Sequence, residues 1–311
     1  MPETLVYRPG GQIAIESRPP QALQPDEVRL QTRMTAVRHG LDAWLLGGLC
    51  EEPAPGSAIL PCGWGVGEVL ETGAAVESIA PGEQVQGYLR HCSEQVMPAQ
   101  QLFTLQWLRP EFAVFADAGA RALMAVDAAC VRYGHSVAIC GMGAVGLMAV
   151  QYALLSGARQ VICLDENQNR LRIAQRLGAH EIFPCRASDA PVRLQQRADA
   201  VIDCAGSAET LERGGAWLRE SGALVAAGCG YAPEAWNRLQ AERPGHLVAL
   251  GAPSLHPEPR LMQRVIQSLA SGEVIVWPLI SHIIAFGDAP AVIPRLAADQ
   301  ERYIKVLLSF E

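Results

Sequence analysis

The stretch VAICGMGAVGLMAVQYALLSGARQVICLD, residues 137–165, decides the fold of this chain. Its first four residues are apolar and predict a buried strand, GMGAVG at 141–146 predicts a tight turn, and the apolar run at 147–155 predicts a helix. A second apolar strand follows at 161–164, and Asp165 closes it. Strand, glycine turn, helix, strand and acid in this order form a βαβ unit that is typical of a dinucleotide site.

Each part of this unit has a physical role in holding a dinucleotide. Glycines allow a tight turn, a close approach of the backbone to a pyrophosphate and close packing of helix on strand, while the first amides of the helix face the phosphates. Asp165 lies about 20 residues after Gly146, where a carboxylate accepts hydrogen bonds from the adenosine ribose. The alternative is that the glycines only let the helix pack on the sheet. The predicted contacts are Gly141, Gly143, Ala144, Val145, Gly146 and Asp165.

The composition indicates a globular chain that acts on small molecules. The 311 residues are 50% hydrophobic, enough for two domains of ordinary size, and the net charge is −7. No run of lysine or arginine offers a surface for nucleic acid or for an anionic membrane. Nine cysteines without a CxxC pair suit a reducing compartment and offer no structural zinc cluster. The N-terminal segment lacks the pattern of a signal peptide, so we expect a cytoplasmic protein.

The rest of the sequence predicts a β-rich domain followed by a doubly wound one. Short β-like segments between proline and glycine turns occupy residues 4–98, and an alanine-rich segment at 111–129 predicts a helix that leads into the second domain. Strands and helices then alternate, as in a parallel sheet covered by helices. The expected elements include a helix at 209–220, a strand at 222–228, and tail strands at 283–286 and 305–308 that return to the first domain.

Four further motifs accompany the glycine turn: GEVLETG at 67–73, PGEQV at 81–85, GHSV at 134–137 and LASGEV at 269–274. With them, the chain resembles the medium-chain dehydrogenase/reductase superfamily over nearly its whole length. The segment 137–165 is most similar to the polyol and sorbitol dehydrogenase branch. By contrast, TAVRHGLD at 35–42 resembles a zinc-free subgroup that includes bacteriochlorophyllide dehydrogenase.

The resemblance implies an α/β fold with two domains. A GroES-like catalytic domain would comprise residues 1–115 and 277–311, and a Rossmann domain of residues 116–276 would bind a nicotinamide cofactor on its doubly wound parallel sheet. The resemblance also implies a homo-oligomer, for which we expect a dimer.

The metal site of this superfamily does not carry over to the chain. Zinc members place a cysteine near residues 38–39, a histidine and a glutamate in a Gly-His-Glu motif, and, in the polyol branch, a second glutamate before the Rossmann domain. Here CGWG at 62–65 puts Trp64 and Gly65 in place of the histidine and the glutamate, and Asp117 falls at the last position. Tryptophan and glycine cannot coordinate zinc. The lobe that holds structural zinc is also missing, so we expect no bound zinc.

Without a metal ion, proton transfer at the reacting oxygen falls to general acid–base groups. His39 is the first candidate, because the ordinary pKa of histidine is about 6.5. Arg38 would stabilise a developing alkoxide, and Asp117 would pair with Arg38 or orient His39. The alternatives are a structural ion pair between Arg38 and Asp117 and a histidine that is only hydrogen-bonded beneath the cofactor.

Other side chains near these positions are less informative. Asp42 is a further catalytic candidate whose alternative role is to cap its local turn. Trp64 would pack the wall of the cleft or shape a ring-sized substrate pocket. His91 and Cys92 are neighbours that suggest a nucleophile, but we expect them to be solvated on an exposed loop.

The cofactor contacts are predicted from the ends of the parallel strands. Asp165 favours NAD(H), because its charge would repel a 2′-phosphate, and NADP(H) is the alternative. Arg170 would flank the adenosine or lie in solvent. Two strand ends resemble the family's contacts to the nicotinamide half, or serve only close packing: Cys204, Ala205 and Gly206, with Ala227 and Gly228.

These predictions point to a zinc-independent oxidoreductase that prefers NAD(H) and transfers a hydride between nicotinamide and an alcohol or ketone. The substrate would be a polyol, a sugar-like molecule or a cyclic secondary alcohol. One alternative is a double-bond reductase of the enoyl or quinone type, against which Asp165 weighs. The other is a catalytically inactive protein that binds nicotinamide, which the missing metal ligands favour.

Overall fold

The computed structural model describes residues 1–8, 12–37, 60–105, 107–184, 194–228, 236–238, 240, 247–250, 258–298 and 303–311. The chain divides into a β-rich unit, Met1–Ala116 with Leu279–Glu311, and a Rossmann-like unit, Asp117–Pro278. Each unit has its own sheet and its own hydrophobic core. Among the predicted catalytic residues, Arg38, His39 and Asp42 lie outside the described residues. None of the described helices is long and apolar enough to cross a bilayer.

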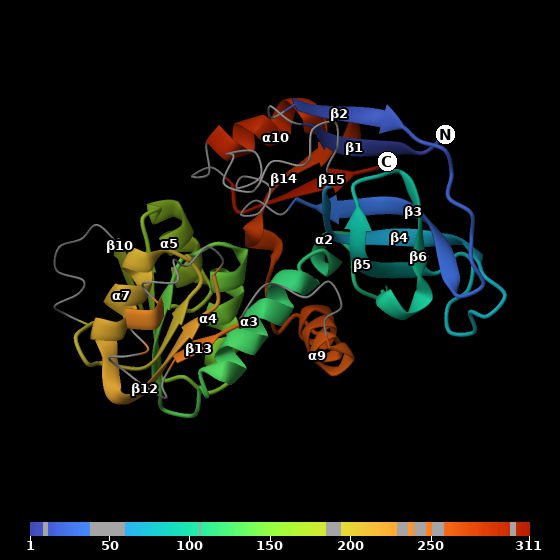
Figure 1. Ribbon diagram of the computed structural model, residues 1–311. Coiled ribbons are helices and arrows are strands. Elements are labelled where there is room, and N and C mark those ends of the chain that lie inside the picture. Colours follow the sequence, from blue (N-terminus) through green and yellow to red (C-terminus); the bar gives the residue numbers. More distant parts are fainter. Residues whose placement is uncertain are drawn as a thin grey trace. The chain divides into compact units, whose positions relative to one another are not determined.

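The Rossmann-like unit contains, in its described residues, a parallel sheet of six strands in the order β10-β9-β8-β11-β12-β13. Figure 1 labels β10, β12 and β13 of this sheet. The order runs outward from the centre in both directions, so the chain reverses between β8 and β11. Ligands of open parallel sheets bind at such a reversal. The strands are β8 (Ser136–Cys140), β9 (Gln160–Asp165), β10 (Glu181–Pro184), β11 (Ala198–Asp203), β12 (Leu218–Ala226) and β13 (Leu247–Ala249).

Helices cover this sheet because its strands are apolar on both faces. All five residues of β8 are buried. In α4 (Ala144–Leu155), eight consecutive residues from Gly146 to Ala153 are buried, which is the pattern of a helix inside a protein. On α7 (Ala208–Trp217), a Cβ added to Gly214 would lie 3.0 Å from a methyl group of Val201, so the glycine lets this helix pack closely on β11.

Two predicted helices differ from the observed ones. The segment 111–129 forms α2 (Pro110–Ala113) and α3 (Ala116–Ala128), and the break lies just before the boundary between the two units, at Asp117. The helix predicted at 209–220 ends at Trp217, and β12 begins at Leu218. Trp217 and Leu218 are buried in the core of the sheet, and Leu218 pairs with Ala198 of β11. Pairing with a distant strand therefore overrides the local helix preference.

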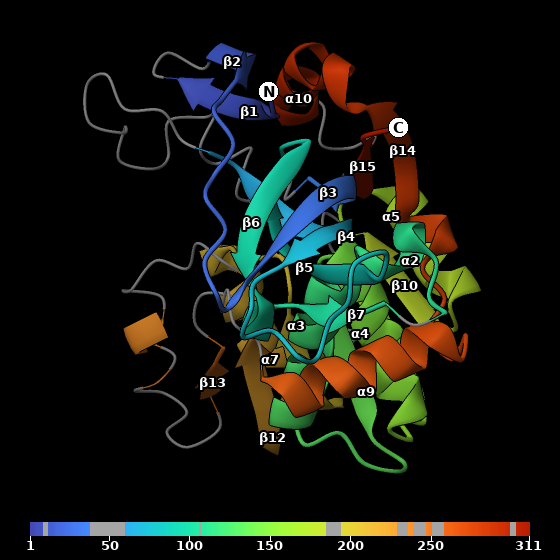
Figure 2. The same cartoon turned by 90° about the vertical axis from the view of Figure 1, so that its right-hand side faces the viewer.

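The β-rich unit is built from strands that lie far apart in the sequence. Its larger sheet has the order β14-β15-β3-β4-β5-β7, with β6 paired to β3, and β1 and β2 form a separate hairpin (Figure 2). The tail strand β15 pairs with β3, so that Leu307 lies opposite Ala36. These strands are β1 (Glu3–Arg8), β2 (Gln12–Ser17), β3 (Glu27–Ala36), β4 (Cys62–Thr72), β5 (Gln84–Arg90), β6 (Glu94–Pro98), β7 (Phe103–Thr104), β14 (Ile280–Ala285) and β15 (Lys305–Ser309).

Candidate dinucleotide-binding site

The glycines between β8 and α4 meet different surroundings. Gly141 has a φ of +84°, and a Cβ there would lie 2.7 Å from the amide nitrogen of Ala205. A Cβ on Gly146 would lie 1.9 Å from the carbonyl oxygen of Gly141, so only glycine lets α4 come this close to the turn. A Cβ on Gly143 would meet nothing within 4 Å. Two glycines thus serve the protein's own packing, and Gly143 borders open space at the start of α4.

The N-terminus of α4 has the properties of a phosphate site. Gly143 is its N-cap residue and supplies no side-chain acceptor, and the first turn carries no acidic residue. Gly143, Ala144 and Val145 are half-buried, whereas Gly146 is buried. A helix N-terminus carries partial positive charge and presents amide donors. The predicted contacts at 143–145 therefore lie where an anion could reach them.

Asp165 ends β9 and ties the glycine turn to the next helix. It is 9% exposed, its Oδ2 accepts a hydrogen bond of 2.6 Å from the amide of Met142, and its Oδ1 accepts one of 2.7 Å from the amide of Asn167. Asn167 in turn caps α5 (Gln168–Arg176) by accepting from the amide of Arg170. A carboxylate has about four acceptor sites, so Asp165 can still accept from ribose hydroxyls. The sequence predicts this ligand role but not the structural one.

Asp203, which sequence reasoning missed, organises the segment after β11. This carboxylate is fully buried and accepts hydrogen bonds from the amide of Ala205 at 2.9 Å, the amide of Gly206 at 3.4 Å and the hydroxyl of Thr210 at 2.9 Å. Gly206 has a φ of +81°, which glycine adopts without strain. The available signal was an acid at the end of a buried strand, as at Asp165.

The segment after β12 is held from two sides. The carbonyl oxygen of Asp203 accepts hydrogen bonds of 2.8 Å from the amides of both Ala227 and Gly228. From α3, Arg121 donates to the carbonyl oxygens of the same two residues. The predicted nicotinamide contacts at 204–206 and 227–228 are thus joined through Asp203, at the carboxyl ends of neighbouring strands.

The cysteines beside this site are not nucleophiles. Burial raises the pKa of Cys204, and the negative charge of Asp203 raises it further. Burial likewise raises the pKa of Cys163 on β9. Because the thiolate is the reactive form, both residues stay protonated and inert near neutral pH.

Trp64 on β4 occupies the interior of the β-rich unit. It is fully buried, its indole N–H donates a hydrogen bond of 3.0 Å to Oε1 of Gln86, and it meets the ring of Tyr88 edge-on with centroids 5.0 Å apart. Packing is therefore its observed role. With no exposed face, Trp64 gives no support to the predicted ring-sized pocket.

Gly65 follows Trp64 at a point where β3 and β4 are closely spaced. A Cβ at this position would lie 2.7 Å from Cγ2 of Thr35 and 2.8 Å from the carbonyl oxygen of Met34. No side chain, and so no metal ligand, fits there. The described residues contain no group of three or more histidine, cysteine, aspartate or glutamate side chains placed to hold a metal ion. The residues at positions 64 and 65 therefore do not fit a zinc site.

Asp117 lies in the first turn of α3 and is half-buried. Its Oδ1 accepts from the following amide, that of Ala118, at 2.6 Å. The partners predicted for it, Arg38 and His39, lie outside the described residues. Its part in catalysis therefore stays a prediction.

His91 and Cys92 are buried, so the expectation that they are solvated is wrong. His91 is 0% exposed and Cys92 is 3% exposed. Strand β1 covers them: the amide of Leu5 donates a hydrogen bond of 2.8 Å to the carbonyl oxygen of His91, and Thr4 forms a bridge with Cys92. The sequence offers no sign that a strand about 90 residues earlier closes over this loop.

Burial determines the protonation of both side chains. The pKa of His91 falls to about 3, because burial disfavours the cation and the charge of Lys305 lies near. Nδ1 of His91 lies 2.7 Å from the hydroxyl oxygen of Thr35. Burial raises the pKa of Cys92 to about 12. A neutral imidazole and a neutral thiol do not form a nucleophile and base pair.

Comparisons with known proteins agree with this geometry. The zinc-binding dehydrogenase family matches residues 144–255. An alcohol dehydrogenase of Cupriavidus necator is 29% identical over 187 residues, which are 57% of this chain and 50% of the relative. D-guloside 3-dehydrogenase of Escherichia coli K12 is 31% identical over 156 residues, 47% of this chain and 45% of the relative. The chain spans about half the length of the curated relatives it matches.

Solved structures share the fold over nearly the whole chain. A protein of Sinorhizobium meliloti 1021, bound to NADP, superposes with a TM-score of 0.83 at 24% identity, and the match covers 99% of both chains. Galactitol-1-phosphate dehydrogenase of Escherichia coli superposes with a TM-score of 0.82 at 20% identity, again over 99% of both chains.

Proposed function

We propose that this chain is a zinc-type alcohol dehydrogenase-like member of the medium-chain dehydrogenase/reductase superfamily. The family match, the curated relatives and the shared fold support this proposal. The protein transfers a hydride between a nicotinamide cofactor and an alcohol or ketone, without zinc. The observation that carries this proposal is the open space at Gly143, beside an N-terminus of α4 that no side chain caps.

The residues of the Rossmann-like unit fit a dinucleotide. The amides at 143–145 would bind the pyrophosphate, Asp165 the adenosine ribose, and the segments at 204–206 and 227–228 the nicotinamide half. Arg170, in the first turn of α5, would flank the adenosine. When bound, the nicotinamide supplies the hydride chemistry. NAD(H) is preferred because the buried charge of Asp165 opposes a 2′-phosphate, although one structural neighbour was bound to NADP.

Changing Asp165 to asparagine tests this preference. We expect the Kd for NADH to rise about tenfold relative to the Kd for NADPH, because the charge that repels the 2′-phosphate is lost. Fluorescence titration with each nucleotide measures both constants. Glu166→Gln, which removes the charge of the exposed neighbour, should leave their ratio unchanged. An unchanged ratio in Asp165→Asn would refute the assigned role.

The proposal that catalysis needs no zinc rests on Trp64 and Gly65 of β4. Position 65 admits no side chain, and the indole N–H of Trp64 is committed to Gln86. In place of a metal ion, His39 would take the proton from the substrate hydroxyl and return it in the reverse direction, with Arg38, Asp117 and Asp42 near the reacting oxygen.

One relative is named a D-guloside 3-dehydrogenase, which supports a sugar-like or polyol substrate class. We also propose that the protein is a dimer.

His39→Ala is the direct test of proton transfer. Turnover should fall about a hundredfold with the best substrate of an alcohol and polyol panel, because the general base is lost, while NADH binding stays intact. His282→Ala removes an exposed histidine of β14 and should have no effect. Retained turnover in His39→Ala would exclude the assignment. Wild-type protein that binds NADH but oxidises no alcohol would be an inactive binding protein, and NADPH-dependent reduction of an enone would indicate a double-bond reductase.

A further inference from the structure

Arg121 lies on α3, within the Rossmann-like unit, near a point where this helix packs closely on two others. A Cβ added to Gly119 would lie 2.6 Å from Val265 on α9 (Pro259–Ala270) and 2.9 Å from Met148 on α4. The three helices are therefore in close contact there. Arg121 follows two residues later, is half-buried, and turns its side chain to the carboxyl end of β12.

The guanidinium of Arg121 binds two successive peptide groups. Its Nε donates to the carbonyl oxygen of Ala227 at 2.5 Å, and its Nη2 donates to that of Gly228 at 3.2 Å. Hydrogen bonds from a charged donor are stronger than neutral ones, and the planar fork of arginine fixes the direction of both acceptors. Ala227 is 1% exposed, so its carbonyl is held in a place with little access to water.

The amides of the same two residues are held as well. The amides of Ala227 and Gly228 donate to the carbonyl oxygen of Asp203, whose carboxylate in turn holds the amides of Ala205 and Gly206. Arg121 and Asp203 thus determine the orientation of the segment after β12 from both sides. The residues that they hold are those proposed for the nicotinamide half of the cofactor.

We infer that Arg121 is a positioning residue for the nicotinamide half of the dinucleotide. It acts through the peptide groups of Ala227 and Gly228, which it orients toward the end of the sheet where the ligand lies. This inference rests on the proposed function and adds a residue from a distant helix to its site. Lysine would keep the charge but lack the planar fork, and methionine would have similar length without any donor.

Arg121→Met tests the inference with two ligands that differ only in the nicotinamide. Binding of NADH, measured by fluorescence titration, should weaken about tenfold. Binding of ADP-ribose, measured by calorimetry, should stay within about twofold of wild type, because it lacks the nicotinamide ring that Ala227 and Gly228 would contact. Arg121→Lys should recover part of the NADH affinity.

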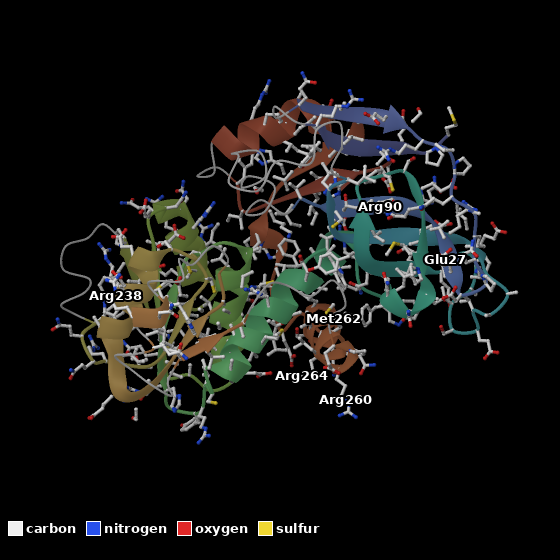
Figure 3. All side chains as sticks on the ribbon, viewed as in Figure 1. Glu27, Arg90, Arg238, Arg260, Met262 and Arg264 are labelled. Carbon is white, nitrogen blue, oxygen red and sulfur yellow. The ribbon has the colours of Figure 1, made fainter. Side chains whose placement is uncertain are left out.

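A matched control removes another arginine that is anchored to α3. Arg264 on α9, labelled in Figure 3, pairs with Asp127 at 2.7 Å, and both side chains are exposed. Exposed ion pairs contribute little, so Arg264→Met should change the affinity for either ligand by less than about twofold.

The outcomes separate the inference from the proposed function. Selective loss of NADH affinity in Arg121→Met, with ADP-ribose affinity kept, supports the inference. Unchanged NADH affinity, or an equal loss for both ligands, overturns it, since equal loss indicates general damage to the fold. If the wild-type protein binds neither ligand, the proposed function fails and the inference fails with it.

Discussion

Gly146→Ala is expected to destabilise the Rossmann-like unit by about 3 kcal/mol and to abolish dinucleotide binding. The added methyl group would lie 1.9 Å from the carbonyl oxygen of Gly141, and a backbone atom cannot give way as a flexible side chain can. Relief requires α4 to move away from the turn, and this movement displaces the amides proposed to bind the pyrophosphate. Urea unfolding measures the stability, and fluorescence titration with NADH measures binding.

Gly143→Ala is the matched control for this substitution. Both changes add one methyl group within the same turn, but a Cβ at Gly143 meets nothing within 4 Å. We expect Gly143→Ala to cost no more than about 1 kcal/mol, because alanine is a weaker N-cap than glycine but meets no clash here. NADH affinity should nevertheless fall at least about tenfold, because the methyl group lies in the space assigned to the pyrophosphate. NADH affinity equal to wild type would show that the phosphates do not pass Gly143, and wild-type stability in Gly146→Ala would contradict the close packing of α4.

The protein is expected to lose stability steeply in mild acid because of His91. The pKa of this buried imidazole is about 3 in the folded state, whereas a histidine in the unfolded chain titrates near its ordinary value of about 6.5. Below that ordinary value the unfolded state binds a proton that the folded state does not. The stabilisation of the folded state by the neutral His91 is therefore fully present above a pH of about 6.5. The free energy of unfolding then falls by about 1.4 kcal/mol for each pH unit as the pH drops toward the pKa of the folded state.

Urea unfolding between pH 7.5 and pH 5 measures this slope. Over that range His91 should account for a loss of about 2 kcal/mol. His91→Asn keeps a polar partner for the hydroxyl of Thr35 and should remove most of that loss, whereas His282→Asn, at an exposed histidine, should keep it. The same acid slope in wild type and His91→Asn would mean that His91 is not the group responsible.

The sequence predicts those parts of the fold that are determined by residues close together in the chain. The βαβ unit at 137–165 is one continuous segment, and its apolar periods and glycines are local. The helix expected at 209–220 fails for the opposite reason. Its last residues are drawn into the sheet by pairing with Ala198, and only the folded structure brings that strand alongside.

The same distinction applies to the candidate site. Asp165 is predictable because it closes a strand at a fixed distance from the glycine turn. Arg121 is not, since its acceptor at Ala227 lies 106 residues further along the chain. The burial of His91 is not predicted, because the strand that covers it, β1, lies more than 80 residues earlier in the chain. Burial by distant strands leaves no periodic signal in the sequence.

The pairing of β15 with β3 affects the order in which the protein can fold during synthesis. The Rossmann-like unit is contiguous, Asp117–Pro278, so it can fold as soon as it has left the ribosome. The end of β3, Met34–Ala36, must wait for Lys305–Ser309, which the ribosome makes more than two hundred residues later. Until then the end of β3 lacks the partner that β15 supplies, and unpaired strand edges pair readily with other chains. Slow or stalled translation late in the message should therefore promote aggregation of the nascent chain through this edge.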